Sequence, residues 1–272
     1  MKYFIDTEFL EGPQKESFPI SLFRKQTPNT IDLISIGIVA EDGREFYAIS
    51  KDFNLKEAWN RFDLEMQSGD MRNVFPEGRK IYWLRENVLK PIFEEFYNSE
   101  IEHYNKAHRL GFYINYPQNS KFSYSNFKRL LKKYGKTNKE IATEIKAFTK
   151  KAVIQENENG KYNISIDESD EITKGDIVWD KPEFYAYYAD YDWVVFCWLF
   201  GKMIDLPKGF LMYCNDLKQE IDRNSYKDGY GTFHGKDIKN HPNFPKQDSS
   251  KSHNAIEDAR WNKQLFEFLA KL

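Results

Sequence analysis

Cysteine is scarce in this chain of 272 residues, which contains only Cys197 and Cys214. Two cysteines do not form the framework of a disulfide-stabilised secreted domain, so we expect both thiols to be reduced and structural. No stretch approaches 18 consecutive apolar residues, which argues against a membrane span. The N-terminus also lacks the basic-then-apolar pattern of a signal peptide. These absences predict a cytoplasmic, intracellular protein without a membrane partner.

An excess of positive charge is also missing. The chain has 40 Lys and Arg residues against 42 Asp and Glu residues, a net charge of −2. Overall basicity therefore does not indicate a nucleic-acid partner, and any basic footprint must be local. Residues 121–151 provide a candidate, with ten Lys or Arg residues against two Glu residues. This segment could grip a phosphate backbone, or it could simply be the solvated face of a helix.

Two carboxylates interrupt the apolar segment at residues 3–10, which has the pattern of a buried strand. Because side chains alternate along a strand, Asp6 and Glu8 project from the same face and lie close together. Like charges in such a place need a cation between them, and oxygen ligands suit Mg²⁺ or Mn²⁺. The Asp-x-Glu pattern is weak alone, since it recurs at Asp63 and Glu65 in a segment that we expect to be helical.

The remaining core-like segments predict a mixed α/β domain that begins with three antiparallel strands. The expected strands are residues 3–10, 31–40, 44–49 and 184–189, and the expected helices are residues 54–62, 83–97, 193–200 and 255–272. Pro91 should kink or divide the second of these helices, and Gly201 should end the third. Asn254 is expected to cap the last helix.

Residues 99–180 differ in character from the rest of the chain. A capping box at residues 137–140 predicts a helix that places Ile141, Ile145 and Phe148 on one face. An acidic, Asn-rich stretch follows, within which residues 161–166 fit a hairpin strand. We interpret residues 99–180 as a helical and hairpin subdomain that is inserted into a single domain spanning residues 1–272.

Two further motifs follow the acidic pair along the chain. Tyr191-Asp192 lies at a strand-to-helix junction, and His253 precedes Asp258 by five residues at the start of the last helix. Asp190 also flanks Tyr191, and we interpret it as a helix cap. His253 on its own would be an exposed loop histidine, but beside the other motifs it becomes a candidate catalytic residue.

In order and local pattern, these three motifs resemble those of the DEDDh superfamily, the ribonuclease H-like 3′-to-5′ exonucleases that include ribonuclease T and oligoribonuclease. Residues 6–9, 31–37, 41–45 and 83–89 are most similar to a bacterial and phage family typified by a mycobacterial 3′-to-5′ exoribonuclease. The resemblance covers about residues 1–97 and 183–272. It does not cover the insertion.

The resemblance implies a ribonuclease H-like mixed sheet flanked by helices. It makes Asp6, Glu8, Asp192 and Asp258 the ligands of two divalent cations, Mg²⁺ or Mn²⁺, and His253 the general base. A cation pair about 3.5–4 Å apart supports hydrolysis of a phosphodiester, and a histidine with a pKa near 6.5 can accept the proton of water. The implied products are nucleoside 5′-monophosphates, released from a free 3′ end.

The implied partner is a nucleic acid, and RNA is favoured over DNA only because the most similar family acts on RNA. A DNA exonuclease is the first alternative, and a non-catalytic module that binds through the basic insertion is the second. Thr7, Phe9 and Leu10 adjoin the acidic pair and are candidates for contact with substrate, although Phe9 and Leu10 fit equally well as core residues. Dimers are common among such exonucleases, and the sequence leaves a homodimer open.

Overall fold

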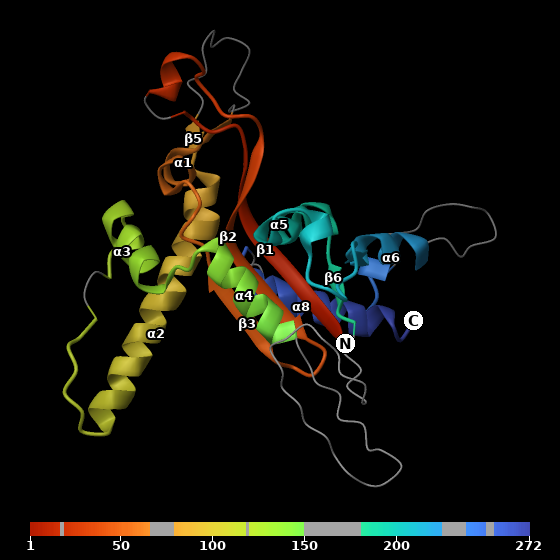
Figure 1. Cartoon of the computed structure of the whole chain (residues 1–272). Coiled ribbons are helices and arrows are strands. Elements are labelled where there is room, and N and C mark those ends of the chain that lie inside the picture. The colour runs from red at the N-terminus through yellow and green to blue at the C-terminus, as the bar shows by residue number, and fades with distance from the viewer. Residues whose placement is uncertain (17–18, 66–78, 118–119, 150–180, 225–237, 249–252) are drawn as a thin grey trace, which may run out of the picture.

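The structure is a computed structural model that describes residues 1–16, 19–65, 79–117, 120–149, 181–224, 238–248 and 253–272. Its centre is a mixed five-stranded sheet in the order β3-β2-β1-β6-β7 (Figure 1). The strands are β1 (Lys2–Gly12), β2 (Thr30–Ala40), β3 (Glu45–Ile49), β6 (Glu183–Ala186) and β7 (Asn215–Asp216). β1, β2 and β3 are antiparallel neighbours, whereas β6 and β7 run parallel to β1.

Helices cover both faces of this sheet. The first face packs on α4 (Asn138–Thr149) and α5 (Ala189–Phe200), and the second packs on α8 (Ala255–Leu269). Tyr3 and Ile5 of β1 belong to the core against α4 and α5, while Phe4 lies 5.3 Å from the ring of Phe266 on α8. An α/β sheet flanked by helices confirms the expected fold class and is consistent with a ribonuclease H-like fold.

A second layer of helices extends one end of the sheet. It comprises α1 (Leu55–Asn60), a short π-helical turn at Arg85–Leu89, α2 (Lys90–Arg109) and α3 (Tyr124–Tyr134). The β1–β2 ladder has a bulge directly after Glu8, where β2 contributes the extra residue Ile34. Ile34 and Leu10 both belong to the cluster formed by these helices. The outer half of α2 extends away from the sheet (Figure 1).

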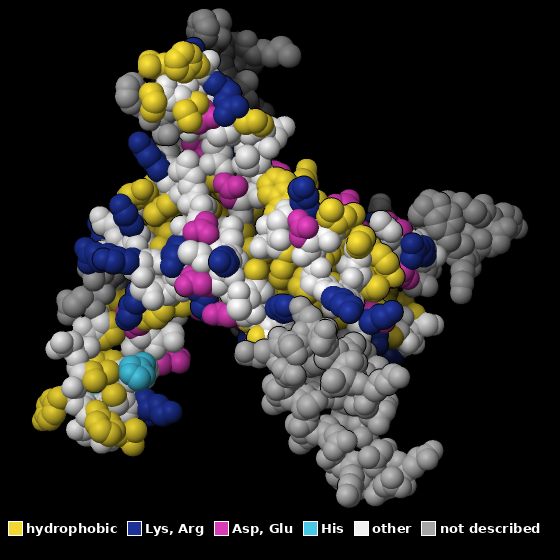
Figure 2. Space-filling model, in the orientation of Figure 1, with side chains coloured by type: hydrophobic (Ala, Val, Ile, Leu, Met, Phe, Trp, Pro, Cys, Tyr) yellow, Lys and Arg dark blue, Asp and Glu magenta, His cyan; other side chains and the backbone are white. Residues whose placement is uncertain are grey.

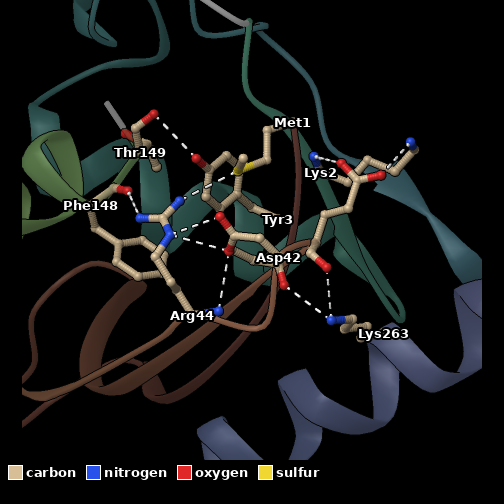
Figure 3. A network of polar contacts seen from close by, with 10 residues as sticks. Met1, Lys2, Tyr3, Asp42, Arg44, Phe148, Thr149 and Lys263 are labelled. Carbon is tan, nitrogen blue, oxygen red and sulfur yellow. Dashed lines mark hydrogen bonds and ion pairs between the residues drawn. The ribbon is translucent and has the colours of Figure 1, made fainter. Parts of the chain in front are cut away.

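A polar network fixes the beginning of β1 (Figure 3). Arg44 donates to the Phe148 carbonyl oxygen at 2.8 Å and pairs with Asp42 at 3.0 Å, and the Tyr3 hydroxyl donates to the Thr149 carbonyl oxygen at 3.2 Å. Lys263 of α8 donates to the Glu41 carbonyl oxygen at 3.0 Å. The turn between β2 and β3, the end of α4 and the middle of α8 are thereby tied to the same end of β1.

Several sequence expectations need correction. Asp63–Glu65 is strand β4, paired with β5 (Arg79–Ile81), and not part of a helix. The helix expected to end at residue 97 continues to Arg109. The division expected at Pro91 is present, because the π-helical turn Arg85–Leu89 directly precedes α2, in which Pro91 is the second residue. The remaining elements are the one-turn helices Ile20–Leu22 and Met203–Asp205 and helix α6 (Leu217–Asn224).

The inserted subdomain stays a prediction. Its expected capping box is present, because the Glu140 side chain accepts a hydrogen bond from the Thr137 amide at 2.6 Å and the Thr137 hydroxyl accepts one from the Glu140 amide at 3.2 Å. The hairpin strand expected at residues 161–166 lies outside the described residues. None of the helices in the described ranges is both long and apolar enough to cross a membrane.

Gly37 allows α8 to approach the sheet closely. It lies opposite Asp6 in the β1–β2 ladder, and a Cβ atom at this position would lie 2.2 Å from the carbonyl oxygen of Ala255. The absence of a side chain at Gly37 therefore sets how near the first turn of α8, which carries Asp258, can come to β1.

We expect Gly37→Ala to lower the free energy of unfolding by about 3 kcal/mol or more, because the added methyl group meets the backbone of Ala255 and forces α8 off the sheet. Urea denaturation measures the effect. Gly43→Ala is the matched control: Gly43 has a φ of +88° but no atom within 4 Å of an added Cβ, so only backbone strain of about 1–2 kcal/mol applies. Equal destabilisation by both substitutions would contradict a packing role for Gly37.

Candidate active site

All five residues expected to carry the chemistry line one cleft with a volume of about 1000 Å³. They come from separate elements: Asp6 and Glu8 from the middle of β1, Asp192 from the first turn of α5, and His253 and Asp258 from the start of α8. Glu8, Asp192 and Asp258 are buried, Asp6 is half-buried, and the His253 side chain is 44% exposed. The fold thus brings residues 250 positions apart into one place.

The cleft exists because β6 is short. β6 pairs with β1 only as far as Phe4, which leaves later backbone groups on this edge of β1 without a strand partner. Asp192 replaces the missing strand, since its Oδ1 accepts from the Thr7 amide at 2.8 Å and from the Thr7 hydroxyl at 2.6 Å. Asn262 of α8 donates from Nδ2 to the Ile5 carbonyl oxygen at 2.8 Å. Thr7 therefore positions a carboxylate.

A left-handed turn places His253 beside the carboxylates. The residue has a φ of +65°, and its amide donates to Oδ2 of Asp258 at 3.0 Å. The side chain of Asn254 caps α8 by accepting from the Ile256 amide at 3.2 Å, as expected from the sequence. The imidazole Nδ1 lies 4.0 Å from Oε1 of Glu8, and its ring packs edge-on against Trp83 at 4.7 Å between ring centres.

The electrostatics of the cleft are unfavourable without a cation. Burial raises the pKa of Asp6 well above its usual range, and repulsion from Asp192, Asp258 and Glu8 raises it further. Burial likewise raises the pKa of Glu8 and that of Asp258. It raises the pKa of Asp192 to about 7, although the two hydrogen bonds from Thr7 oppose the shift. These carboxylates are poised to be neutralised by protons or by metal ions.

The donor set fits hard divalent cations. Oxygen or nitrogen atoms of Glu8, His253 and Asp258 all lie within 4.8 Å of one another, and Asp6 and Asp192 face the same cleft. Carboxylate oxygens are the preferred ligands of Mg²⁺ and Mn²⁺. Arg61 is the single Lys or Arg among the described residues that line the cleft, and its guanidinium is bonded to the carbonyl oxygens of Glu11 and Pro13.

Aromatic rings form much of the wall around the carboxylates. Phe9 lies 5.7 Å from the ring of Tyr191, and both line the cleft with Tyr188 and Trp198. Tyr191 and Trp198 are half-exposed, at 53% and 50%. Phe9 therefore remains a candidate for contact with a base.

Two sequence interpretations are wrong. Leu10 is fully buried within the core around α1, α2 and α3, so it does not reach the cleft, and its core alternative is correct. Asp190 is exposed in the first turn of α5 and does not cap the helix. The N-cap residue is Tyr188, which has a left-handed backbone conformation and whose side chain forms no capping hydrogen bond. Asp192, not Asp190, faces the cleft, as the motif indicated.

The structure adds residues that the sequence did not single out. Gln247 donates from Nε2 to Oδ1 of Asp258, and Trp83 holds the imidazole of His253. Asn254 also donates to Oε2 of Glu95 at 2.8 Å, which joins the start of α8 to α2. Their spacing in the chain follows no motif, and only the meeting of α2, α8 and the loop before α8 brings them together.

Comparison with known proteins gives a partial match. A segment of 58 residues is 47% identical to a 3′-5′ exoribonuclease of Mycobacterium tuberculosis strain H37Rv and, equally, to its counterpart in strain CDC 1551. The match covers 21% of this chain and 26% of each relative, so the chain aligns with about a quarter of the length of these curated relatives. No protein-family model matches the chain.

Without divalent cations, we expect stability to fall as the pH rises from about 4 to about 7. The folded state holds the Asp192 proton up to a pKa of about 7, whereas the unfolded chain releases it near 3.8. Folding therefore takes up a proton in this interval, and the free energy of unfolding decreases with pH. Thermal melting in EDTA should show the decrease, and Asp192→Asn should reduce it.

Added Mn²⁺ should raise the melting temperature of the wild type more at pH 7.5 than at pH 5, because protons compete with the metal for the same oxygens. Asp190→Asn is the matched control, since the neighbouring carboxylate is exposed and should leave both responses unchanged. An unchanged pH dependence in Asp192→Asn, or no response of the wild type to Mn²⁺ or Mg²⁺, would contradict the proposed metal site.

Proposed function

We propose that this protein is a metal-dependent 3′-to-5′ exoribonuclease that releases nucleoside 5′-monophosphates. The partial similarity to mycobacterial 3′-5′ exoribonucleases supports an exoribonuclease-like enzyme. The observation that carries the proposal is the convergence of four carboxylates and a histidine, from three parts of the chain, in one cleft without a free cationic side chain among its described lining residues. Such an arrangement destabilises the fold unless cations bind there.

In the proposed mechanism, Asp6, Glu8, Asp192 and Asp258 hold two divalent cations. When bound, such cations activate water as Lewis acids and stabilise negative charge on the phosphoryl oxygens. His253 accepts the proton of the attacking water, a role that suits a half-exposed imidazole at the edge of a carboxylate cluster. Thr7 holds Asp192 through two hydrogen bonds, and Trp83 orients the His253 ring.

The aromatic wall suggests how the 3′ end is held. Phe9 and Tyr191 lie beside Glu8 and Asp192, so the terminal base can stack on them while its phosphate faces the carboxylates. Stacking on a side chain requires an unpaired base and tolerates any base identity. We therefore propose a single-stranded 3′ end as the substrate, and sequence-independent shortening.

A DNA exonuclease is the second candidate, because the carboxylate cluster acts on the phosphodiester and not on the sugar. The name of the mycobacterial relatives favours RNA. We further propose that residues 1–272 act as one catalytic domain and that residues 99–180 belong to an addition to it; α2 crosses residue 99 without a break.

The test is release of mononucleotides from a 5′-labelled oligoribonucleotide and its deoxy counterpart, with Mg²⁺, Mn²⁺ or EDTA. We expect a ladder that shortens from the 3′ end with metal and disappears in EDTA. His253→Ala should lower kcat by about 10²- to 10⁴-fold because the general base is lost. Asp6→Asn should lower kcat at least as strongly because a metal ligand is lost.

Asp190→Asn is the control for both variants and should retain wild-type turnover, since its carboxylate lies outside the cleft. Preferential shortening of the deoxy substrate would replace the RNA assignment with the DNA exonuclease. Failure to shorten either substrate with either metal, in a protein that melts cooperatively, would reject catalysis and favour the non-catalytic binding module.

A further inference from the structure

The cleft lacks the positive charge that a polyanionic substrate requires. The acids Asp6, Glu8, Glu11, Asp63, Asp192 and Asp258 line it, and among the described lining residues only Arg61 opposes them. The Arg61 guanidinium is already bonded to two backbone carbonyl oxygens and pairs with Glu57 at 3.4 Å. Bound cations would serve the scissile phosphate, so the phosphates further along an RNA strand need a basic surface elsewhere.

The chain concentrates positive charge in one segment. Residues 103–139 hold nine of its 40 Lys and Arg residues and none of its 42 Asp and Glu residues. The described part of the segment comprises the outer half of α2, the connection that follows it, and α3. We refer to residues 103–117 and 120–134 as the basic arm. Lys and Arg side chains gather over α3, whereas the free end of α2 shows mainly hydrophobic side chains with a Lys or Arg among them (Figure 2).

Most of these charged side chains have no acidic partner among the described residues. Lys106, Arg109, Lys121, Lys128 and Lys132 are exposed, and none forms an ion pair with another described residue. Lys133, by contrast, pairs with Glu100 at 2.5 Å. Exposed cations without protein partners are free to exchange counterions for phosphates, which is the main source of affinity for nucleic acids.

Exposed aromatic rings accompany the charge. Phe112 is 64% exposed, Tyr113 is 100% exposed and Tyr116 is 53% exposed, all just after the end of α2. A solvated helix face has no need of such rings in water, whereas interleaved cations and aromatic rings are the combination that binds single-stranded nucleic acids without sequence preference.

The arm is connected directly to the cleft. The segment leading into α2 contacts His253 through Trp83, and Glu95 on the first turns of α2 accepts a hydrogen bond from Asn254. From Glu95 to Arg109, the helix rises about 20 Å, at 1.5 Å per residue. At a stacked spacing of about 3.4 Å per nucleotide, a strand needs about six nucleotides to cover this distance.

We propose that the basic arm binds the 5′ portion of a single-stranded RNA whose 3′ end occupies the cleft, an inference that rests on the proposed exoribonuclease function. The arm holds phosphates through its unpaired Lys and Arg side chains and bases through its exposed rings. Substrates longer than about six nucleotides engage both sites, whereas di- and trinucleotides engage the cleft alone. The arm therefore sets a preference for long substrates.

The experiment compares 5′-fluorescein-labelled RNA of 3 and about 15 nucleotides. The arm variant is Lys106→Gln/Arg109→Gln/Lys132→Gln, and the matched control is Lys56→Gln/Lys208→Gln/Lys271→Gln, three lysines that are also exposed but lie outside the arm. Binding of both RNAs is measured by fluorescence anisotropy in EDTA over a range of salt concentrations. Turnover of both RNAs is measured with Mg²⁺.

We expect the arm variant to bind the 15-mer at least about tenfold more weakly. Its slope of log Kd against log salt should fall by about 2, because each of the three lost phosphate contacts contributes about 0.7 to the slope. Phe112→Ala/Tyr113→Ala should weaken binding by about fivefold or more through lost stacking. The control variant should match the wild type, and kcat and KM for the 3-mer should stay within about twofold in all variants.

Equal affinity of the wild type for the 3-mer and the 15-mer would overturn the arm proposal, as would equal losses in the arm and control variants. Because binding is measured in EDTA, these outcomes do not depend on turnover. Tight 15-mer binding with no hydrolysis would instead reject the proposed function and leave the arm as a nucleic-acid site.

Discussion

The early end of β6 is the constraint on which the site depends. A fifth or sixth residue in this strand would pair with the edge of β1 and occupy the place that Asp192 now takes. Because β6 stops, the Thr7 amide needs an acceptor, and the carboxylate of Asp192 supplies it at 2.8 Å. One backbone hydrogen bond thereby fixes the distance between the acids of β1 and the acid of α5. As a consequence, the Asp192 carboxylate is buried and has little access to water.

The second constraint is the close contact between α8 and the sheet. Gly37 lets the backbone of Ala255 lie against β2, so Asp258 faces the acids of β1 without a long side chain to span the gap. The left-handed conformation of His253 then brings the chain back over the cleft and directs its amide to Asp258. The same few residues therefore determine both how α8 packs on the sheet and how the residues of the site are arranged.

Charge is divided between two regions of the molecule. The acids meet in the cleft, where burial raises their pKa values and makes cation binding favourable. The basic arm carries none of the 42 acidic residues. This separation suits the proposed function. Lys or Arg side chains near the carboxylates would compete with metal ions for the same oxygens, whereas positive charge at a distance would attract an RNA strand.

The sequence by itself determined the strand-and-helix order, the motif residues and the fold class, because hydrophobic periodicity and caps such as Asn254 are local signals. Only the tertiary structure decided what each part of β1 packs against: Leu10 continues the alternation of Asp6 and Glu8 along the strand, but there the helices α1, α2 and α3 cover it and bury it in the core. The same holds for Asp63–Glu65, a strand formed only because β5 pairs with it, and for Trp83 and Gln247, which reach the site through contacts between distant segments. Local propensity fixes what each segment can be, whereas non-local packing fixes where it lies.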